Sequence, residues 1–213
     1  MTSPIAPRVL CVIGSSASDS ATHVVLAEIA RHLGTLGVDV DVFDPAREEL
    51  PLFNPKSSYG IPTYRALKIR VEQADALVLG TPDYHGSVSS TLKNFLDHFW
   101  QEFAGKLFAQ VVASNDKGLT VMDQLRTVAR QCYAWSLPYG VAFASPTDVK
   151  DGAIVSPALE SRLNMLAHDL RTYGALLAQQ RQADLAGHTP GFLARLRPAP
   201  VAAESTPATH SSR

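Results

Sequence analysis

Cysteine is scarce in this chain: two residues among 213, at Cys11 and Cys132. Neither belongs to a C-x-x-C pair or to a cluster with histidine, so the sequence supports neither a disulfide framework nor a zinc site. Both lie in apolar stretches, where cysteine commonly acts as a small buried hydrophobic residue. We therefore expect no bound metal and a reducing compartment, the cytoplasm.

An excess of charge is also missing. The chain has 19 Lys and Arg against 20 Asp and Glu, a formal net charge of −1. A protein built to bind nucleic acid needs a basic excess to meet phosphate charge, so we expect no nucleic-acid partner. An electron carrier that is steered to its partners by charge is usually strongly acidic, and this chain does not fit that class either.

Long hydrophobic runs are absent as well. No stretch approaches the roughly 20 apolar residues that a membrane helix needs. Residues 1–8 lack the charged-then-apolar pattern of a secretory signal. We expect no membrane attachment, and the length and the 46% hydrophobic content suit one well-buried domain.

What the sequence does contain is a regular alternation of short apolar runs and segments of helical period. The expected strands are residues 8–13, 38–43, 76–80, 107–113 and 141–144. Helical period follows from about residue 21, over 63–73, from about 90 to 103, and over 122–132 and 159–177. This alternation predicts parallel pairing with right-handed crossovers, that is, an α/β fold with a five-stranded, doubly wound sheet in three layers.

The last residues read differently. From about residue 186 the chain is rich in Ala, Pro, Ser and Thr, and helical period is lost by Arg197. We expect one domain over residues 1–185 and a flexible extension over 186–213. Phe192, Leu193 and Leu196 are able to dock on a neighbour.

In such a sheet the ligand binds beyond the carboxyl ends of the strands, where the strand order reverses. The loop after the first strand opens a helix and carries five hydroxyl side chains: Ser15, Ser16, Ser18, Ser20 and Thr22. Hydroxyls, free amides and the helix dipole together make a cradle for an anion, here without Lys or Arg. Neither G-x-x-x-x-G-K-[ST] nor G-x-G-x-x-G is present. The alternative is that these serines are caps and loop residues only.

The loop after the third strand reads Thr81-Pro82-Asp83-Tyr84-His85-Gly86-Ser87. Such a stiff turn can donate main-chain hydrogen bonds to the edge of a planar ring, and Tyr84 offers a stacking face. The alternative is a surface turn whose tyrosine packs on its own domain.

Residues 81–99, TPDYHGSVSSTLKNFLDHF, closely resemble the TPEYNGS-x-P-x-x-LKN-x-x-D signature of the NADPH-dependent FMN reductase family. The matching residues are Pro82, Tyr84, Gly86, Ser87, Leu92, Lys93, Asn94 and Asp97. The order of elements agrees over roughly residues 8 to 180. The resemblance implies a flavodoxin-like fold with strand order 2-1-3-4-5 and bound FMN. It also implies NADPH or NADH as co-substrate, and a homodimer or homotetramer. The implied acceptor is a small molecule: free flavin, a quinone, an azo compound or a metal oxyanion.

By that resemblance the first loop corresponds to the family's G-S-x-R-x-x-S-x-N phosphate loop. Ser15 and Ser20 match, whereas the usual arginine is Ala17 and the usual asparagine is Thr22, so Ser16, Ser18 or His23 would have to compensate. In the second loop Asp83 replaces Glu and His85 replaces Asn. The implied ring contacts come mostly from the main chain. The flavin-binding candidates in the second and third loops are Pro82, Asp83, Tyr84, His85, Gly86, Ser114, Asn115 and Gly118.

Two side chains are candidates for chemistry. Lys117 would stabilise negative charge on the reduced ring, and His85 would give a proton to the acceptor, unless His85 is simply a turn residue. The other histidines show no ligand spacing and are expected at the surface: His32, His98, His168, His188 and His210. Trp100 and Phe103 are expected in the core or at an interface. Two other functions stay open: a flavodoxin-like electron carrier, and a flavin-binding or flavin-free module without turnover, the latter suggested by Ala17.

Overall fold

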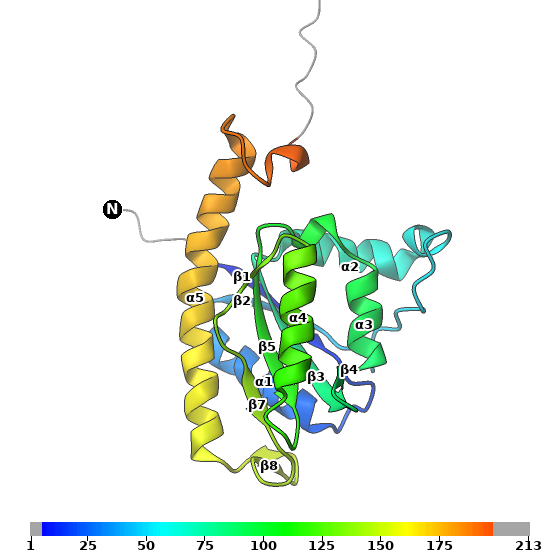
Figure 1. The fold of residues 1–213 in the computed structure, drawn as a ribbon. Coiled ribbons are helices and arrows are strands. Elements are labelled where there is room, and N and C mark those ends of the chain that lie inside the picture. Colours follow the sequence, from blue (N-terminus) through cyan, green and yellow to red (C-terminus); the bar gives the residue numbers. More distant parts are fainter. Residues whose placement is uncertain (1–5, 198–213) are drawn as a thin grey trace, which may run out of the picture.

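The computed structural model describes residues 6–197, which form three layers around one sheet (Figure 1). The strands are β1 (Arg8–Ile13), β2 (Asp39–Phe43), β3 (Ala76–Tyr84), β4 (Ser87–Val88), β5 (Leu107–Ala113), β6 (Trp135–Ser136), β7 (Val141–Phe143), β8 (Val149–Lys150) and β9 (Ala153–Ile154). The helices are α1 (Ala21–Thr35), α2 (Pro62–Gln73), α3 (Ser90–Asp97), α4 (Leu119–Gln131) and α5 (Pro157–Ala186). Three short 3₁₀ helices are η1 (Ser58–Gly60), η2 (Gln101–Phe103) and η3 (Ala194–Leu196).

The sheet has the predicted order. β2, β1, β3 and β5 lie side by side and pair in parallel, and both β6 and β7 pair in parallel with β5. The fifth position is therefore filled by two short pieces. Pro138, which has no N–H to donate, stands between them. The order 2-1-3-4-5 is confirmed when the short hairpin strand β4 is left out of the count.

Both faces of the sheet are covered. Figure 1 shows α5 along one side of the sheet and α2, α3 and α4 on the other. In β1, Val9 and Cys11 join the core under α1 and α5, whereas Leu10 and Val12 join the core under α2, α3 and α4. A strand buried on both faces needs apolar residues at every position, which explains the continuous run that β1 shows in the sequence.

Two hairpins were not predicted. β3 runs four residues past Gly80, because Asp83 and Tyr84 pair with Val88 and Ser87 of β4. β8 and β9 form a second hairpin around Asp151-Gly152, both with positive φ (50° and 76°). An Asp-Gly pair is a strong signal for a two-residue hairpin turn, and the flanking strands of two residues each are too short to show a period.

The last described residues fold back on the domain. Leu193 is 2% exposed and lies against Gly105, and the Phe192 ring stacks on Tyr133 with centroids 6.2 Å apart. Arg195 lies over the same tyrosine, 3.9 Å from the ring centroid. Phe192 and Leu193 therefore dock on their own chain. Of the extension predicted over residues 186–213, residues 198–213 lie outside the described residues, and the boundary at residue 185 stays a prediction.

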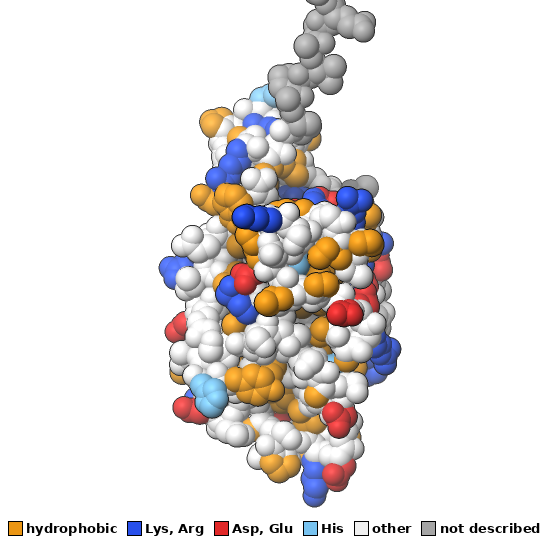
Figure 2. Space-filling model, turned by 90° about the vertical axis from the view of Figure 1, so that its right-hand side faces the viewer, with side chains coloured by type: hydrophobic (Ala, Val, Ile, Leu, Met, Phe, Trp, Pro, Cys, Tyr) orange, Lys and Arg blue, Asp and Glu red, His pale blue; other side chains and the backbone are white. Residues whose placement is uncertain are grey.

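Two further expectations concern the surface and the cysteines. Across residues 6–197, no helix combines the length and the apolar character required to cross a membrane. On the face that carries α2 and α3, acidic, basic and hydrophobic side chains are interspersed (Figure 2).

Cys11 and Cys132 are free and buried as predicted, and burial raises the pKa of the Cys11 thiol to about 12.

We predict that Gly14→Ala lowers the free energy of unfolding by about 2 kcal/mol. A Cβ at residue 14 would lie 2.4 Å from the Gly80 carbonyl oxygen, a main-chain atom held in the sheet. Gly34→Ala is the matched control. Apart from neighbouring residues and the backbone of its own helix, no atom of the described residues lies within 4 Å of the added carbon there, so stability should stay the same or rise by up to about 1 kcal/mol. Urea unfolding of both variants checks this, and equal effects would contradict it.

Candidate functional site

The three loops singled out in the sequence meet at the carboxyl edge of the sheet. The Gly14 N–H donates to the Gly80 oxygen at 2.7 Å, which joins the ends of β1 and β3. The Ser89 hydroxyl donates to the Gly14 carbonyl at 2.6 Å, and the Ser114 hydroxyl donates to the Asp83 carboxylate at 2.8 Å. The first, second and third loops are therefore tied to one another by hydrogen bonds, and the candidate residues lie around one edge.

The first loop leads directly into α1. Ser20 is the N-cap of the helix, and its hydroxyl oxygen accepts a hydrogen bond from the His23 N–H. Ser16 and Ser18 are exposed and Ser20 is half-buried. Ser15 is 6% exposed and its oxygen accepts from the Ala17 N–H. Ser16, Ser18 and Ser20 therefore offer accessible hydroxyls beside the free amides of a helix N-terminus.

Thr22 is in a different position. It is 2% exposed, and a Cβ at Gly80 would lie 3.3 Å from its methyl carbon. Its side chain thus packs against the third strand. Of the five predicted hydroxyl residues, Thr22 and Ser15 are largely covered.

One functional candidate, Asp44, was missed in the sequence. Its carboxylate lies 2.9 Å from His23 Nε2 and accepts the Ala46 N–H at 2.9 Å. Burial alone would raise the pKa of Asp44, but the hydrogen bonds from His23 and Ala46 outweigh it and lower the pKa. Asp44 directly follows β2, so its place at the carboxyl edge of the sheet was the available signal.

The second loop is a tight hairpin. His85 and Gly86 form its turn with φ of 57° and 74°, a conformation that histidine adopts less readily than glycine. The Asp83 carboxylate accepts the Gly86 N–H at 2.8 Å as well as the Ser114 hydroxyl. Tyr84 is 59% exposed. Asp83 therefore makes its hydrogen bonds within the site loops, and the exposed side chains of the hairpin are Tyr84 and His85.

A residue of α4 holds the hairpin from the other side. The Gln124 side-chain amide donates to the Gly86 carbonyl at 3.0 Å and accepts the Ser87 hydroxyl at 3.1 Å. Both edges of the turn are thus fixed, one by Asp83 and one by Gln124. A turn fixed in this way can present main-chain groups to a planar ring without reorganising.

The third loop begins with Ser114, whose N–H donates to the Phe143 carbonyl at 2.8 Å. Asn115 and Lys117 are exposed, whereas Gly118 is buried and has a φ of 62°. A Cβ at Gly118 would lie 2.8 Å from a Val112 methyl carbon. Gly118 is needed for the close approach of the backbone, and Ser114, Asn115 and Lys117 line a hollow of about 360 Å³.

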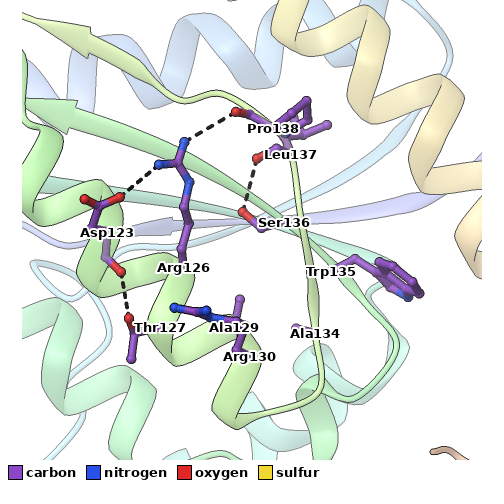
Figure 3. A pocket seen from close by; sticks show the side chains of 10 residues that line it. All are labelled: Asp123, Arg126, Thr127, Ala129, Arg130, Ala134, Trp135, Ser136, Leu137 and Pro138. Carbon is purple, nitrogen blue, oxygen red and sulfur yellow. Dashed lines mark hydrogen bonds and ion pairs between the residues drawn. The ribbon is translucent and has the colours of Figure 1, made fainter.

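Two larger hollows differ in the residues that line them and in their position on the sheet. One of about 1050 Å³ is lined by Ser18, His23 and Asp44 of the candidate site, among others. The other, of about 750 Å³, lies between α4 and residues 134–138 (Figure 3). Figure 3 shows Arg126 there, donating to Asp123 and to the Pro138 carbonyl. This hollow lies beside β6, which pairs with the first residues of β5, away from the carboxyl edge.

The donors present fit FMN. Exposed hydroxyls at a helix N-terminus suit a terminal phosphate, and the fixed hairpin and the exposed Tyr84 suit a planar ring. Ala17 adds no donor from its side chain, so positive charge at the first loop has to come from elsewhere. Gly14 lets the end of β1 lie close to that of β3, and Gly80 lets Leu26 and Thr22 of α1 pack closely on β3, which together bring the first two loops near each other.

The histidines expected at the surface divide into two groups. His168 and His188 are exposed, and His210 lies outside the described residues. His98 is 2% exposed, with Nδ1 2.8 Å from the Asn94 carbonyl and its ring 5.1 Å from that of Phe53. His32 lies between Glu28 and Glu160 at 3.3 and 2.9 Å. The prediction was wrong for His98, whereas His32 is half-buried. One helical turn of sequence does not reveal what packs against it.

Glu28, His32 and Glu160 place three ligand atoms within 4.8 Å of one another, although no metal was predicted. Arg31 already donates to Glu28, so its positive charge competes with any cation there. Of the two aromatic residues expected in the core or at an interface, Phe103 is buried and Trp100 is 55% exposed.

Comparison with known proteins gives a consistent picture. Residues 7–148 match the NADPH-dependent FMN reductase family. FMN-dependent NADPH-azoreductases from Staphylococcus haemolyticus and Staphylococcus aureus are 31% identical over 143 residues, 62% of this chain and 74% of theirs. Among solved structures, the flavoenzyme NAD(P)H:(acceptor) oxidoreductase FerB from Paracoccus denitrificans superposes with a TM-score of 0.63 at 18% identity, covering 82% of this chain and 98% of its own.

A second solved structure, an oxidoreductase from Corynebacterium diphtheriae, gives a TM-score of 0.64 at 16% identity, again over 82% of this chain and 98% of its own. A WrbA-like flavodoxin from Agrobacterium tumefaciens gives 0.54 at 18% identity, over 82% and 98%. At these identities the structures show the fold, which is flavodoxin-like.

We predict that Asp83→Ala loosens the hairpin, because it removes the acceptor of both the Gly86 amide and the Ser114 hydroxyl. The free energy of unfolding should fall by about 2 kcal/mol, and hydrogen exchange at the Gly86 amide should become faster. Asp123→Ala is the control: this exposed aspartate pairs only with Arg126 three residues along the helix, and its loss should cost about 0.5 kcal/mol or less. Unchanged exchange at Gly86 would show that the carboxylate does not hold the turn.

Proposed function

Since this chain belongs to the NADPH-dependent FMN reductase family, we propose that its three loops hold FMN and pass electrons to a small-molecule acceptor. The protein is an NAD(P)H-dependent FMN oxidoreductase, as the family and the 31% identical azoreductases indicate. Three parts of this function are proposals: which residues bind the flavin, which molecule accepts the electrons, and which oligomer the protein forms.

The observation that carries the binding mode is the set of hydroxyls at the start of α1. Ser16, Ser18 and Ser20 stand accessible at a helix N-terminus that follows directly on a buried parallel strand. The main-chain N–H groups of the first helical turn have no partners within the helix, and one of them, that of His23, is capped by Ser20. We place the phosphate of FMN at this point, with Ser15 and Thr22 contributing through the main chain.

The ring would lie against the second loop. Residues 82–86 present main-chain groups at its edge, and Ser114, Asn115 and Gly118 bound the site from the third loop. When bound, FMN supplies the two-electron chemistry between the nicotinamide and the acceptor. The chain orients the ring and leaves one face open. Lys117 and the hairpin amides stabilise the negative charge that reduction produces.

His85 is proposed as the proton donor to the acceptor. It is exposed at the tip of the hairpin, so an acceptor on the open face can reach it. The acceptor class follows from the same openness, because a ring face beside the 59% exposed Tyr84 selects little by shape. The curated relatives are azoreductases, and azo compounds, quinones, free flavin and metal oxyanions are the acceptors proposed here.

Two proposals concern the setting of the protein. A homodimer or homotetramer follows from the family resemblance. The cytoplasm is supported by Cys11 and Cys132, which are both free and buried, as expected where thiols stay reduced.

The binding mode predicts that FMN binds at least roughly tenfold more tightly than riboflavin, because only FMN can use the charge-assisted hydrogen bonds of the first loop. Fluorescence titration of the apoprotein with both flavins measures the ratio. The double substitution Ser16→Ala and Ser18→Ala should reduce the affinity for FMN and leave that for riboflavin unchanged. Equal affinities for the two flavins in the unmodified protein would show that no phosphate site exists.

The enzymatic function predicts steady oxidation of NADPH by the FMN-loaded protein when a quinone is supplied. A flavodoxin-like carrier, the other candidate, would be reduced without turning over.

The role proposed for His85 is tested in the same assay. His85→Asn keeps a residue that tolerates positive φ, so flavin binding should persist while acceptor reduction slows. If the variant turns over at the original rate, His85 is only a turn residue.

A further inference from the structure

Three polar groups form a chain beside the first loop. The Ser20 hydroxyl oxygen lies 2.9 Å from His23 Nδ1, and His23 Nε2 lies 2.9 Å from the Asp44 carboxylate. The side chains of His23 and Asp44 are only 13% and 10% exposed. This row of hydrogen-bonded side chains links Ser20, in the first loop, to the carboxylate of Asp44, which lies 24 residues further along the sequence, after β2.

The chemistry of these groups fixes where one proton lies. The pKa of Asp44 is lowered, because its hydrogen bonds from His23 and Ala46 outweigh the effect of burial, so the carboxylate is ionised at neutral pH. An ionised carboxylate can only accept, so Nε2 of His23 must carry a proton. Neutral His23 then has a bare Nδ1, which accepts the hydroxyl proton of Ser20.

While Nδ1 of His23 is unprotonated, the Ser20 hydroxyl has no hydrogen-bond donor left for a ligand. Its oxygen already accepts the His23 main-chain N–H as the helix cap, and its one proton points to Nδ1. Protonation of Nδ1 reverses the bond, so that His23 donates to the Ser20 oxygen. The Ser20 proton is then released toward the loop, where an anion can accept it.

We propose that binding of the FMN phosphate is coupled to the uptake of one proton by His23, so that the protonated His23 ring, held by Asp44, supplies the positive charge that no side chain of residues 14–22 provides. This inference rests on the proposed phosphate site. His23 acts through Ser20 and is therefore a positioning residue that selects phosphorylated flavin over riboflavin. The proton comes from solvent, and no covalent bond changes.

Charges of both signs surround the His23 ring. Its Nε2 lies against the Asp44 carboxylate, and the ring belongs to the first turn of α1, at the positive end of the helix dipole. A phosphate bound at this helix N-terminus adds negative charge beside the ring. The other charged groups that line the same hollow are Glu28, Arg31, Arg47, Glu48 and Glu160, and Asp19 stands exposed in the loop.

Arg47 is the neighbour that bears most directly on the pair. Its Nε lies 3.3 Å from Asp44 Oδ2, but its side chain is 84% exposed, so solvent screens its charge. Glu28 and Arg31 pair with each other further along α1. Asp44 is therefore the charged group in direct contact with the His23 ring.

The direct test is ¹⁵N NMR of the histidine side chains in the apoprotein and in its complexes with FMN and with riboflavin. We expect Nδ1 of His23 to be unprotonated in the apoprotein at pH 7.5, protonated with FMN, and unprotonated with riboflavin. His23→Gln identifies the signal. An Nδ1 that stays unprotonated in the FMN complex overturns the inference.

A thermodynamic test uses the ratio of the two affinities between pH 7 and 9, where the phosphate, with a second pKa near 6, is already a dianion. As the pH rises, the ratio of the affinity for FMN to the affinity for riboflavin should fall by at most tenfold per pH unit, because one proton is taken up when FMN binds. In His23→Gln it should be roughly tenfold weaker at pH 7 and independent of pH. Glutamine suits the third position of a helix, so α1 should persist, and unchanged riboflavin binding verifies the fold.

His32→Gln is the matched control, because His32 lies on the same helix but faces Glu28 and Glu160. It should keep the pH dependence of the unmodified protein. If FMN is preferred over riboflavin equally at every pH, this inference fails while the phosphate site stands. If FMN is not preferred at any pH, the proposed phosphate site fails and the inference with it.

Discussion

The close approach of β1 and β3 at their carboxyl ends is the constraint on which the site depends. Gly14 and Gly80 meet there through a hydrogen bond of 2.7 Å, and a Cβ on Gly14 would fall 2.4 Å from the Gly80 oxygen. Gly14 has no side chain to push the end of β1 away from β3, and Gly80 has none to push Leu26 and Thr22 of α1 away from β3. A larger residue at either place would move the helix N-terminus away from the hairpin and separate the two halves of the proposed flavin site.

Most polar side chains at the loops form hydrogen bonds with other residues of the loops and so fix the shape of the loops. Asp83 ties the hairpin to the third loop, Gln124 holds the far side of the turn, and Ser89 fixes the end of β1. The groups left for a ligand are main-chain amides and a few exposed hydroxyls. A site of this kind is rigid and nearly neutral, which suits a cofactor that is held by position while its charge changes on reduction.

In the proposed site, the positive charge near the first loop comes from a proton on His23 and not from an arginine. A guanidinium is charged at every physiological pH, whereas an imidazole gains its charge only with a proton. The proposal therefore links the affinity for phosphate to proton concentration. It also places the charge outside the loop, on a histidine in contact with a carboxylate that follows β2.

The sequence by itself determined the class of fold, the order of the central strands and the edge of the sheet at which the three candidate loops gather. Those features depend on local periods, on glycine and proline at turns, and on the motif of residues 81–99, all of which are written in consecutive residues. The tertiary structure decided the split of the last strand, the burial of His98 and the meeting of His23 with Asp44. Each of these depends on which distant segments pack together, and no local pattern records that.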